Sequence, residues 1–153
     1  MIDPRWDRWI LASVNTYLTE EIAKLSGITV YPEGLPDVDR HGAQEWVEIR
    51  LSGPDYTALL NDEWRARVDI TLLVRCIINE EDAYRIRDYK GVISKILSGT
   101  IPLYEYGTDD TQQFGCLQLL GRIVTTDYQR SGVDKPMQES LIDCRGFVDL
   151  TGI

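Results

Sequence analysis

Histidine is almost absent from this chain of 153 residues, which contains only His41. A Ser-His-Asp or Cys-His nucleophile needs a histidine as its base. His41 lies in a polar segment of residues 37–42, DVDRHG, where a solvated side chain is the ordinary outcome. The GxGxxG and GxxxxGK[ST] patterns of nucleotide-binding loops are missing as well. These gaps predict a protein without a reaction of its own and without a cofactor.

Cysteine is also scarce, and the three cysteines are far apart in the sequence: Cys76, Cys116 and Cys144. A structural zinc site needs closely spaced pairs of ligands, which this spacing does not offer. Each cysteine lies in an apolar, strand-like run, where a reduced cysteine behaves as a small hydrophobic side chain. We therefore expect reduced cysteines in the core and folding in the cytoplasm of the producing cell.

A basic excess and a long apolar run are the last two features that the chain lacks. The formal charge is −9, so the electrostatic attraction that drives non-specific binding to nucleic acid is missing. No run approaches the ~20 apolar residues of a membrane helix. The N-terminus, MIDPRWDRW, is unlike a secretory signal. We expect a soluble protein that neither grips duplex DNA nor enters a membrane.

Acidic residues cluster in three places that could in principle bind a divalent metal. Asp37 and Asp39 alternate with His41, the run EED occupies residues 80–82, and DD occupies residues 109–110. The first cluster lacks the central glycine and terminal glutamate of a calcium loop. The second fits the start of a helix, with Asn79 as its cap, and the third fits a turn. A small acidic metal-dependent nuclease stays open as an alternative.

The most regular pattern in the chain is the alternation of apolar and polar residues over residues 63–78, EWRARVDITLLVRCII. A strand points successive side chains to opposite faces, and this stretch would span roughly 50 Å at about 3.3 Å per residue. Most strands are two to three times shorter. A strand of this length reaches beyond the core of a small protein, so the pattern indicates assembly and not catalysis.

The remaining patterns predict two helices and five further strands. Apolar residues recur at helical spacing over residues 3–27, with Asp3 as cap, and over residues 80–98. In the second of these helices the predicted apolar face consists of Tyr84, Tyr89, Val92, Ile93, Ile96 and Leu97. Strands are predicted over residues 28–31, 45–51, 101–106, 114–128 and 139–150, with a linking segment at 52–62. The result is a single domain, residues 1–153, of the α+β class. It has a mainly antiparallel sheet with two helices packed on one face, in the order α-β-β-β-α-β-β-β.

The polar side of the long strand is the candidate subunit interface. Arg65, Arg67, Asp69 and Arg75 share this parity, and arginines there could pair with carboxylates of a neighbouring copy. Trp46 has the parity of the polar residues in its own strand and is expected to be exposed to a partner. The alternative is a solvated sheet face without a partner.

In this layout the chain resembles the tail terminator (tail completion) proteins of long-tailed bacteriophages. The similarity covers nearly the whole chain and lies in four stretches: the end of the first helix, LSGITVYPEGLP; the hairpin WVEIRLSG to EWRARVDITLLVRC; the helix EEDAYRIRDYKGVISKILSG; and the closing strands FGCLQLLGRIVTTDY and ESLIDCRGFVDLTG. It implies an α/β fold related to tail-tube subunits and a hexameric ring that caps the finished tube. No family residue can be transferred individually.

The resemblance leads to a virion structural protein at the head–tail junction, assembled in the host cytoplasm. Its implied partners are other copies of the chain in a hexamer, the tail tube protein and the head–tail connector or adaptor protein. DNA would pass through the lumen without specific binding. A head–tail adaptor or neck protein and a tail-tube subunit of the same particle stay open as alternatives.

Overall fold

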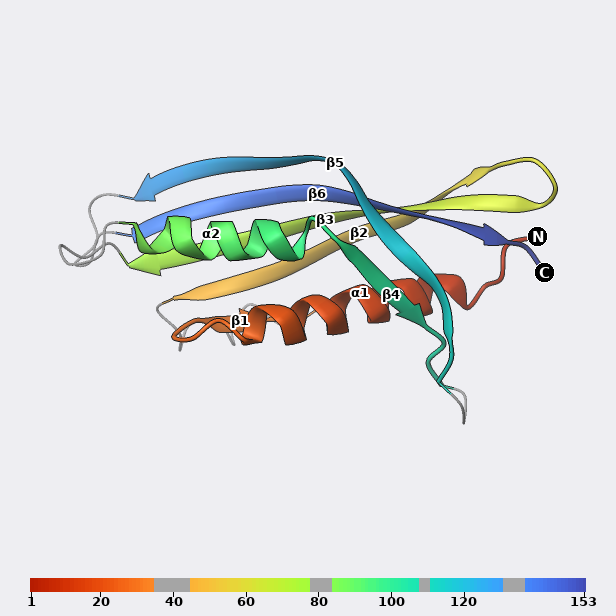
Figure 1. The fold of residues 1–153 in the computed structure, drawn as a ribbon, viewed down its shortest axis with the longest axis horizontal. Coiled ribbons are helices and arrows are strands. Elements are labelled where there is room, and N and C mark those ends of the chain that lie inside the picture. Colours follow the sequence, from red (N-terminus) through yellow and green to blue (C-terminus); the bar gives the residue numbers. More distant parts are fainter. Residues whose placement is uncertain (35–44, 78–83, 108–110, 131–136) are drawn as a thin grey trace.

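Both helices lie on one face of a six-stranded sheet, with strands in the order β1-β2-β3-β6-β5-β4 (Figure 1). The computed structural model describes residues 1–34, 45–77, 84–107, 111–130 and 137–153. The elements are α1 (Trp6–Ala23), β1 (Thr29–Tyr31), β2 (Trp46–Ala58), β3 (Glu63–Ile77), α2 (Arg85–Ile96), β4 (Thr100–Tyr104), β5 (Gln113–Arg130) and β6 (Met137–Thr151). All strand pairs are antiparallel except β1 with β2. The predicted α+β class and element order are confirmed.

The long strand is the centre of the sheet. β3 runs from Glu63 to Ile77 and pairs along its whole length with β6, and on its other side with β2. Its side chains alternate between buried and less buried positions as the sequence predicts. From Ala66 onward, the inward side chains of β3 are at most 1% exposed: Ala66, Val68, Ile70, Leu72, Val74 and Cys76. The apolar parity is therefore the core face.

Helix α1 covers the core with an apolar stripe. Ile10, Val14, Leu18 and Ile22 are spaced by four residues and are fully buried, as expected for one face of a helix. Asp3 was predicted as the cap. Its carboxylate accepts a hydrogen bond from the backbone N–H of Arg5 at 2.9 Å, although the regular helix begins only at Trp6.

Helix α2 begins at Arg85, and the predicted cap Asn79 with the acidic residues 80–82 lies outside the described residues. Its predicted apolar face is partly wrong. Tyr84 is 70% exposed and Val92 is 42% exposed, whereas Ile86 is buried. Tyr84 precedes the helix, and Val92 is rotated by about 100° from its buried neighbour Ile93. The stripe that packs on the sheet therefore starts at Ile86.

Strand β2 is longer than predicted. Residues 52–62 were expected to be a link, but β2 continues to Ala58 and only four residues, 59–62, form the turn to β3. The strand accommodates its Gly-Pro-Asp sequence with a bulge between Ser52 and Asp55 and a cis peptide bond at Gly53-Pro54. Gly53 has φ of 100°, and a Cβ there would lie 2.7 Å from the carbonyl oxygen of Arg67. Only glycine fits this position.

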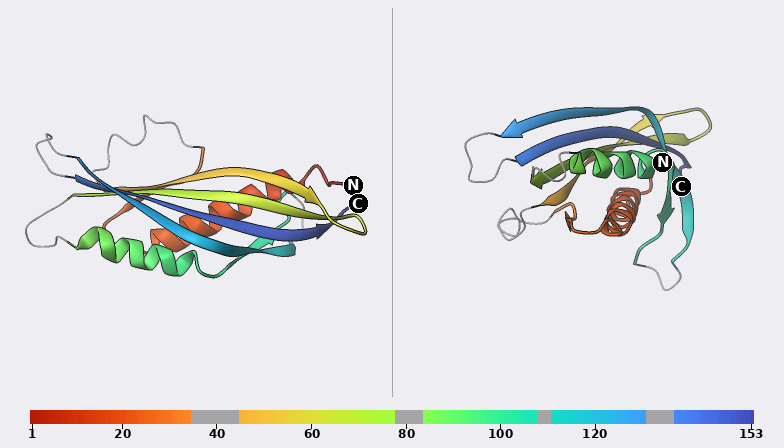
Figure 2. Two further views of the ribbon diagram at one scale, coloured as in Figure 1. Left: turned by 90° about the horizontal axis from the view of Figure 1, so that it is seen from above. Right: turned by 60° about the vertical axis from the view of Figure 1, so that its left-hand side comes forward.

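Strands β4 and β5 bend the sheet around α1, as the views in Figures 1 and 2 show. The pairing of β5 with β6 is interrupted between Leu120 and Val124, and bulges of this kind bend a strand. The β4 segment then lies against α1. The Trp9 indole N–H donates to the carbonyl of Tyr106 at 2.7 Å, and the Tyr104 N–H donates to the Ser13 hydroxyl at 2.9 Å.

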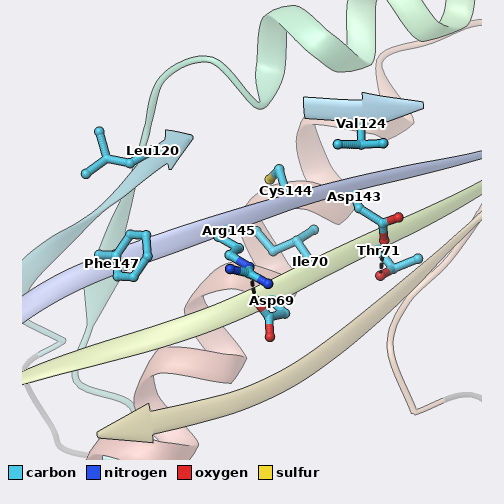
Figure 3. A pocket seen from close by; sticks show the side chains of 9 residues that line it. All are labelled: Asp69, Ile70, Thr71, Leu120, Val124, Asp143, Cys144, Arg145 and Phe147. Atoms are coloured by element: carbon cyan, nitrogen blue, oxygen red, sulfur yellow. Dashed lines mark hydrogen bonds and ion pairs between the residues drawn. The ribbon is translucent and has the colours of Figure 1, made fainter. Parts of the chain in front are cut away.

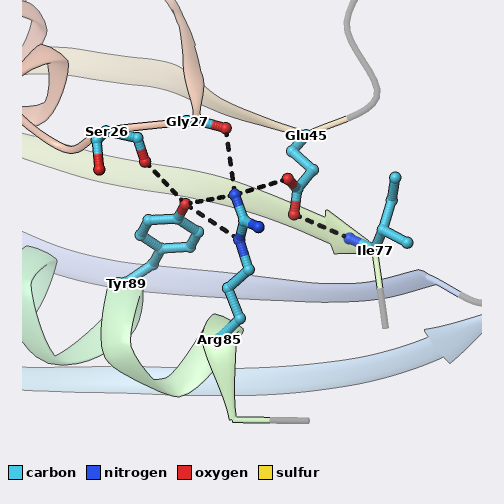
Figure 4. A network of polar contacts seen from close by, with 6 residues as sticks. All are labelled: Ser26, Gly27, Glu45, Ile77, Arg85 and Tyr89. Carbon is cyan, nitrogen blue, oxygen red and sulfur yellow. Dashed lines mark hydrogen bonds and ion pairs between the residues drawn. The ribbon is translucent and has the colours of Figure 1, made fainter. Parts of the chain in front are cut away.

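A polar network joins the end of α1, the start of α2 and two strands (Figure 4). The Arg85 guanidinium lies 2.8 Å from the Glu45 carboxylate, and it also donates to the Tyr89 hydroxyl at 3.0 Å. The Tyr89 hydroxyl donates to the carbonyl of Ser26 at 3.0 Å, and Glu45 accepts from the N–H of Ile77 at 3.2 Å. These bonds fix both helices relative to the β2–β3 pair.

Candidate interaction surface

The sheet face opposite the two helices, called the outer face below, is formed by alternate residues of β2, β3, β5 and β6 (Figure 2). No described helix covers it. In a strand pair, residues directly opposite each other on one face are in contact range. The register of β3 with β6 and β2 therefore decides which outer-face charges meet.

One end of the outer face carries a bidentate ion pair. Arg65 of β3 is directly opposite Asp149 of β6, and its Nε and Nη2 donate to the two carboxylate oxygens at 2.8 and 3.0 Å. These hydrogen bonds hold the pKa of Asp149 below its usual value, against a smaller opposing effect of burial. Planar bidentate pairing is the geometry for which arginine is preferred over lysine.

Four further charged residues continue this row toward the middle of the sheet. Arg67 pairs with Asp55 of β2 at 2.9 Å and lies 3.7 Å from Asp69 on its own strand. Asp69 in turn lies 3.2 Å from the Nε of Arg145 on β6. We call this set, together with Arg65 and Asp149, the charge ladder.

The charge ladder changes the interpretation of the predicted interface residues. Arg65, Arg67 and Asp69 were expected to meet charges of a neighbouring copy, but each forms an ion pair within its own chain. All of these side chains remain at least one-third exposed. The ladder therefore orders the outer face and leaves its charged side chains partly exposed, although Arg67 Nε and Asp69 Oδ1 are buried within it.

Trp46 is the clear error of the sequence-based prediction, because it is buried with 6% exposure. Parity places it on the polar side of β2, but two neighbours cover its ring. Tyr31 of β1 packs edge-on at 6.2 Å between ring centroids, and the Arg75 guanidinium lies 5.9 Å from the Trp46 ring. Arg75 also donates to the Met137 sulfur at 2.7 Å. Trp46 and Arg75 thus fill one end of the sheet and are not a free surface.

A groove of about 590 Å³ follows the outer face between β3, β6 and β5 (Figure 3). Its rim is apolar at Leu120, Val124 and Phe147, and its polar side is formed by Asp69, Thr71, Asp143 and Arg145. Leu120 is 53% and Val124 is 39% exposed. A second hollow of about 520 Å³ shares Leu120 and Phe147 and extends to Arg65 and Asp149.

The sequence-based prediction missed the β5 and β6 residues of this groove. Phe147 and Asp143 share the outward parity of β6, which was readable from the alternation in residues 139–150. Leu120 and Val124 were not readable in this way, because the interruption of pairing between them shifts the register of β5. Apolar groups beside ordered charges are a composition typical of protein contact surfaces.

Metal ligands do not gather in the part of the chain that the structure describes: no group of three His, Cys, Asp or Glu side chains forms a site there. The three acidic clusters at residues 37–41, 80–82 and 109–110 lie outside it. Cys76 and Cys144 are buried as predicted, whereas Cys116 is exposed. The expectation of a core position is therefore wrong for Cys116. No described helix is long and apolar enough to span a membrane.

The fold and this surface together define a small α+β protein whose sheet has one covered face and one open, charged and grooved face. No protein-family model matches the chain, and the comparison with curated proteins finds no match.

Proposed function

We propose that this protein is a virion structural subunit, a tail terminator that assembles into a ring, caps the tail tube and joins it to the head-side connector. The observation that carries the proposal is the open outer face, in which ordered charges flank an exposed apolar groove on strands of 13 to 18 residues. The resemblance in layout to tail terminator proteins supports the same assignment.

The groove supplies what a stable contact between subunits requires. Leu120, Val124 and Phe147 offer apolar area that loses contact with water on association. The charge ladder beside them is held in place by bidentate and shared ion pairs, so little side-chain entropy is lost when a partner docks. Exposed ion pairs add little affinity but restrict which partners fit.

The groove is tested by placing a charge on its rim. Val124→Asp should break the ring, because a carboxylate would be buried without a partner in the contact. Val92→Asp is the matched control, since Val92 is the same residue type with 42% exposure on the helix side, against 39% for Val124. Native mass spectrometry and negative-stain electron microscopy should show rings for the wild type and for Val92→Asp, and smaller species for Val124→Asp.

The arginines of the ladder are tested by charge reversal. Arg65→Glu with Arg67→Glu should lower the ring population. The control is Arg8→Glu with Arg87→Glu, which makes the same change in net charge at exposed positions on α1 and α2 and should leave the ring population unchanged. Wild-type protein that stays monomeric at every concentration would refute ring assembly. Metal-dependent cleavage of DNA by the purified protein would instead support the nuclease alternative.

Which partners the ring binds, the tail tube or the connector, distinguishes a terminator from an adaptor or a tube subunit. A terminator should bind one end of preformed tail tubes and stop their growth, and the capped tubes should then bind the connector. Continuous incorporation along the tube would indicate a tube subunit. Binding to the connector without binding to the tube would indicate an adaptor or neck protein.

A further inference from the structure

The edges of the sheet differ in how they are closed. At the β4 edge, α1 satisfies backbone groups through Ser13 and Trp9. The β2 edge is paired with β1 over three residues and then carries the bulge at Gly53-Pro54, a device that discourages pairing between edges. β5 is different, because β4 pairs with it only up to Gln118.

The second half of β5, Val124 to Arg130, is an open edge. It pairs with β6 on one side, and no other described strand pairs with it on the other. The described side chains at its start, Val124, Thr125 and Thr126, are exposed. This stretch has no proline and no lysine, and β-branched residues such as these favour strand pairing.

The register shows which backbone groups face this open edge. In an antiparallel pair, residues alternate between facing one neighbour and facing the other. Pro102 is opposite Cys116 and has no N–H to donate, and the N–H of Leu119 donates to Gly99 just before β4 at 3.3 Å. Leu117 and Leu119 therefore face β4, and Leu120 faces β6.

The alternation continues on β6 beyond the interruption in β5. Leu120 is paired with Arg145 and Val124 with Asp143, two residues further along the unbroken β6 strand. Val124 must then face β6 again, as Leu120 does. The N–H and C=O groups of residues 125, 127 and 129 consequently point to the open edge.

At the opposite edge of the sheet, β1 offers the complementary backbone groups. The N–H of Thr29 donates to the carbonyl of Glu45 at 3.2 Å, so Thr29 faces the β2 side and Val30 faces away from the sheet. The strand registers connect Asp127, Ser140, Val74, Val47 and Val30 in one row across the sheet. Two outward-facing residues, one at each edge, thus lie at the same level.

We infer that the open edge of β5 pairs with β1 of a second copy, antiparallel, with Asp127 and Val30 as a hydrogen-bonded pair. β5 runs antiparallel to both β1 and β2, so rotation about an axis along the strands brings the two edges together without a shift. The contact joins two different surfaces, and repeating such a contact gives a ring when the rotation between neighbouring copies closes. The inference deepens the proposed function and rests on its ring assembly.

A pair of neighbouring proline substitutions tests this contact. Thr125→Pro removes an N–H that faces the open edge and leaves the β5–β6 bonds intact, whereas Thr126→Pro removes one that bonds β6. We expect Thr125→Pro to keep its circular dichroism spectrum and melting temperature in the monomer and to lose the ring. Thr126→Pro should lower the melting temperature. Rings formed by Thr125→Pro as readily as by the wild type would overturn the inference.

Cross-linking tests the register independently of proline. With Val30 and Asp127 paired, residues 29 and 128 form the adjacent non-hydrogen-bonded pair, whose Cα atoms lie about 4.5 Å apart, within disulfide range. In a Cys116→Ser background, protein with Thr29→Cys is mixed with protein carrying Tyr128→Cys and oxidised. We expect a disulfide-linked dimer from the mixture and none when Thr57→Cys, at an exposed position of β2, replaces Thr29→Cys.

The outcomes separate this inference from the proposed function. Wild-type rings without the 29–128 cross-link, together with rings from Thr125→Pro, would leave ring assembly standing and remove the β5–β1 contact. A cross-link from Tyr128→Cys alone would show two β5 edges paired with each other, which also contradicts the inference. Monomers at every concentration would remove both.

Discussion

The three cysteine thiols lie in different environments, and their reactivity should follow. Burial raises the pKa of Cys76 to about 12, with a smaller contribution from Glu45, and burial raises the pKa of Cys144 to about 11. Thiolate is the reactive species, so both should be nearly inert at pH 8. Cys116 is exposed.

Mass spectrometry after brief alkylation with iodoacetamide at pH 8 checks this expectation. Dilute folded protein should carry one modification, at Cys116, and unfolded protein should carry three. The Cys116→Ser variant is the control and should remain unmodified while folded. Rapid labelling of Cys76 in folded protein would contradict its placement against the core.

The ion pair between Arg65 and Asp149 predicts a specific dependence of stability on pH. Because the Asp149 pKa is lower in the folded protein than the unfolded value of about 3.9, its contribution is present above pH 4 and is lost as pH falls through the folded pKa. Asp149→Asn should therefore reduce the free energy of unfolding at pH 7, and this reduction should shrink as pH falls through the folded pKa. The reduction should be small because the Asp149 side chain is 47% exposed.

Denaturant titration of the wild type, Asp149→Asn, Arg65→Gln and the double variant measures the effect. If the pair acts as described, the double variant should lose no more than either single variant loses at pH 7. Fully additive losses would mean that the two side chains act independently.

At the scale of elements, the two faces of β3 should respond differently to the same substitution. Ile70 is 1% exposed against the helices, so Ile70→Asp buries an unpaired carboxylate and should prevent folding or make the protein insoluble. Leu73 lies on the outer face with intermediate exposure. Leu73→Asp should fold and lose less stability.

Soluble yield and thermal melting of the two variants provide the comparison. Equal damage at both positions would mean that the outer face is as deeply buried as the core face. Leu73→Asp that folds but no longer forms rings would extend the subunit contact to this part of β3.

Elements with a regular pattern were predictable from the sequence, and irregular ones were not. β3 has an unbroken alternation, and α1 has a stripe of fully buried residues at four-residue steps, so local periodicity fixes both. β2 was cut short in the prediction because Gly53 and Pro54 have the composition of a turn. In the structure they form a bulge, which depends on the pairing with β3 and not on local preference.

The outer face was predictable in its parity but not in its details. Alternation indicates on which side of the sheet a residue lies, and Arg65 and Arg67 are indeed on the polar side. It does not indicate what covers a position, so the contact of Tyr31 with Trp46 was missed. The groove depends on the bend of β5 near Leu120, a product of tertiary structure that periodicity cannot reveal.

At the scale of the whole molecule, two features leave surface uncovered: the strands are long, and the helices cover only one face of the sheet. The hairpin of β2 and β3 extends beyond the helix layer (Figure 1), and Leu60 at its tip is 85% exposed. The outer face is open along the same strands. An isolated subunit thus leaves apolar area in water that assembly would cover.

The charge of the whole molecule predicts how a ring would treat DNA. Each copy has a formal charge of −9, and in a hexamer six such charges would surround one lumen. A wall with even part of this excess repels phosphates, so a genome could slide through without binding. The alternative is that the negative charge only keeps the free subunit soluble, in which case it would lie on the outside of the ring.

Titration of purified rings with duplex DNA at low salt tests the non-binding lumen, because weak screening reveals any basic track along the wall. We expect no binding at micromolar concentrations by fluorescence anisotropy. Reversing charge at the outer-face carboxylates locates this face in the ring: Asp69→Lys with Asp143→Lys and Asp149→Lys should weaken the ring if the face lies between subunits, as proposed, and should produce salt-sensitive DNA binding by intact rings if it lines the lumen instead. Salt-sensitive micromolar binding by the wild type would contradict free passage and would favour a role in handling nucleic acid.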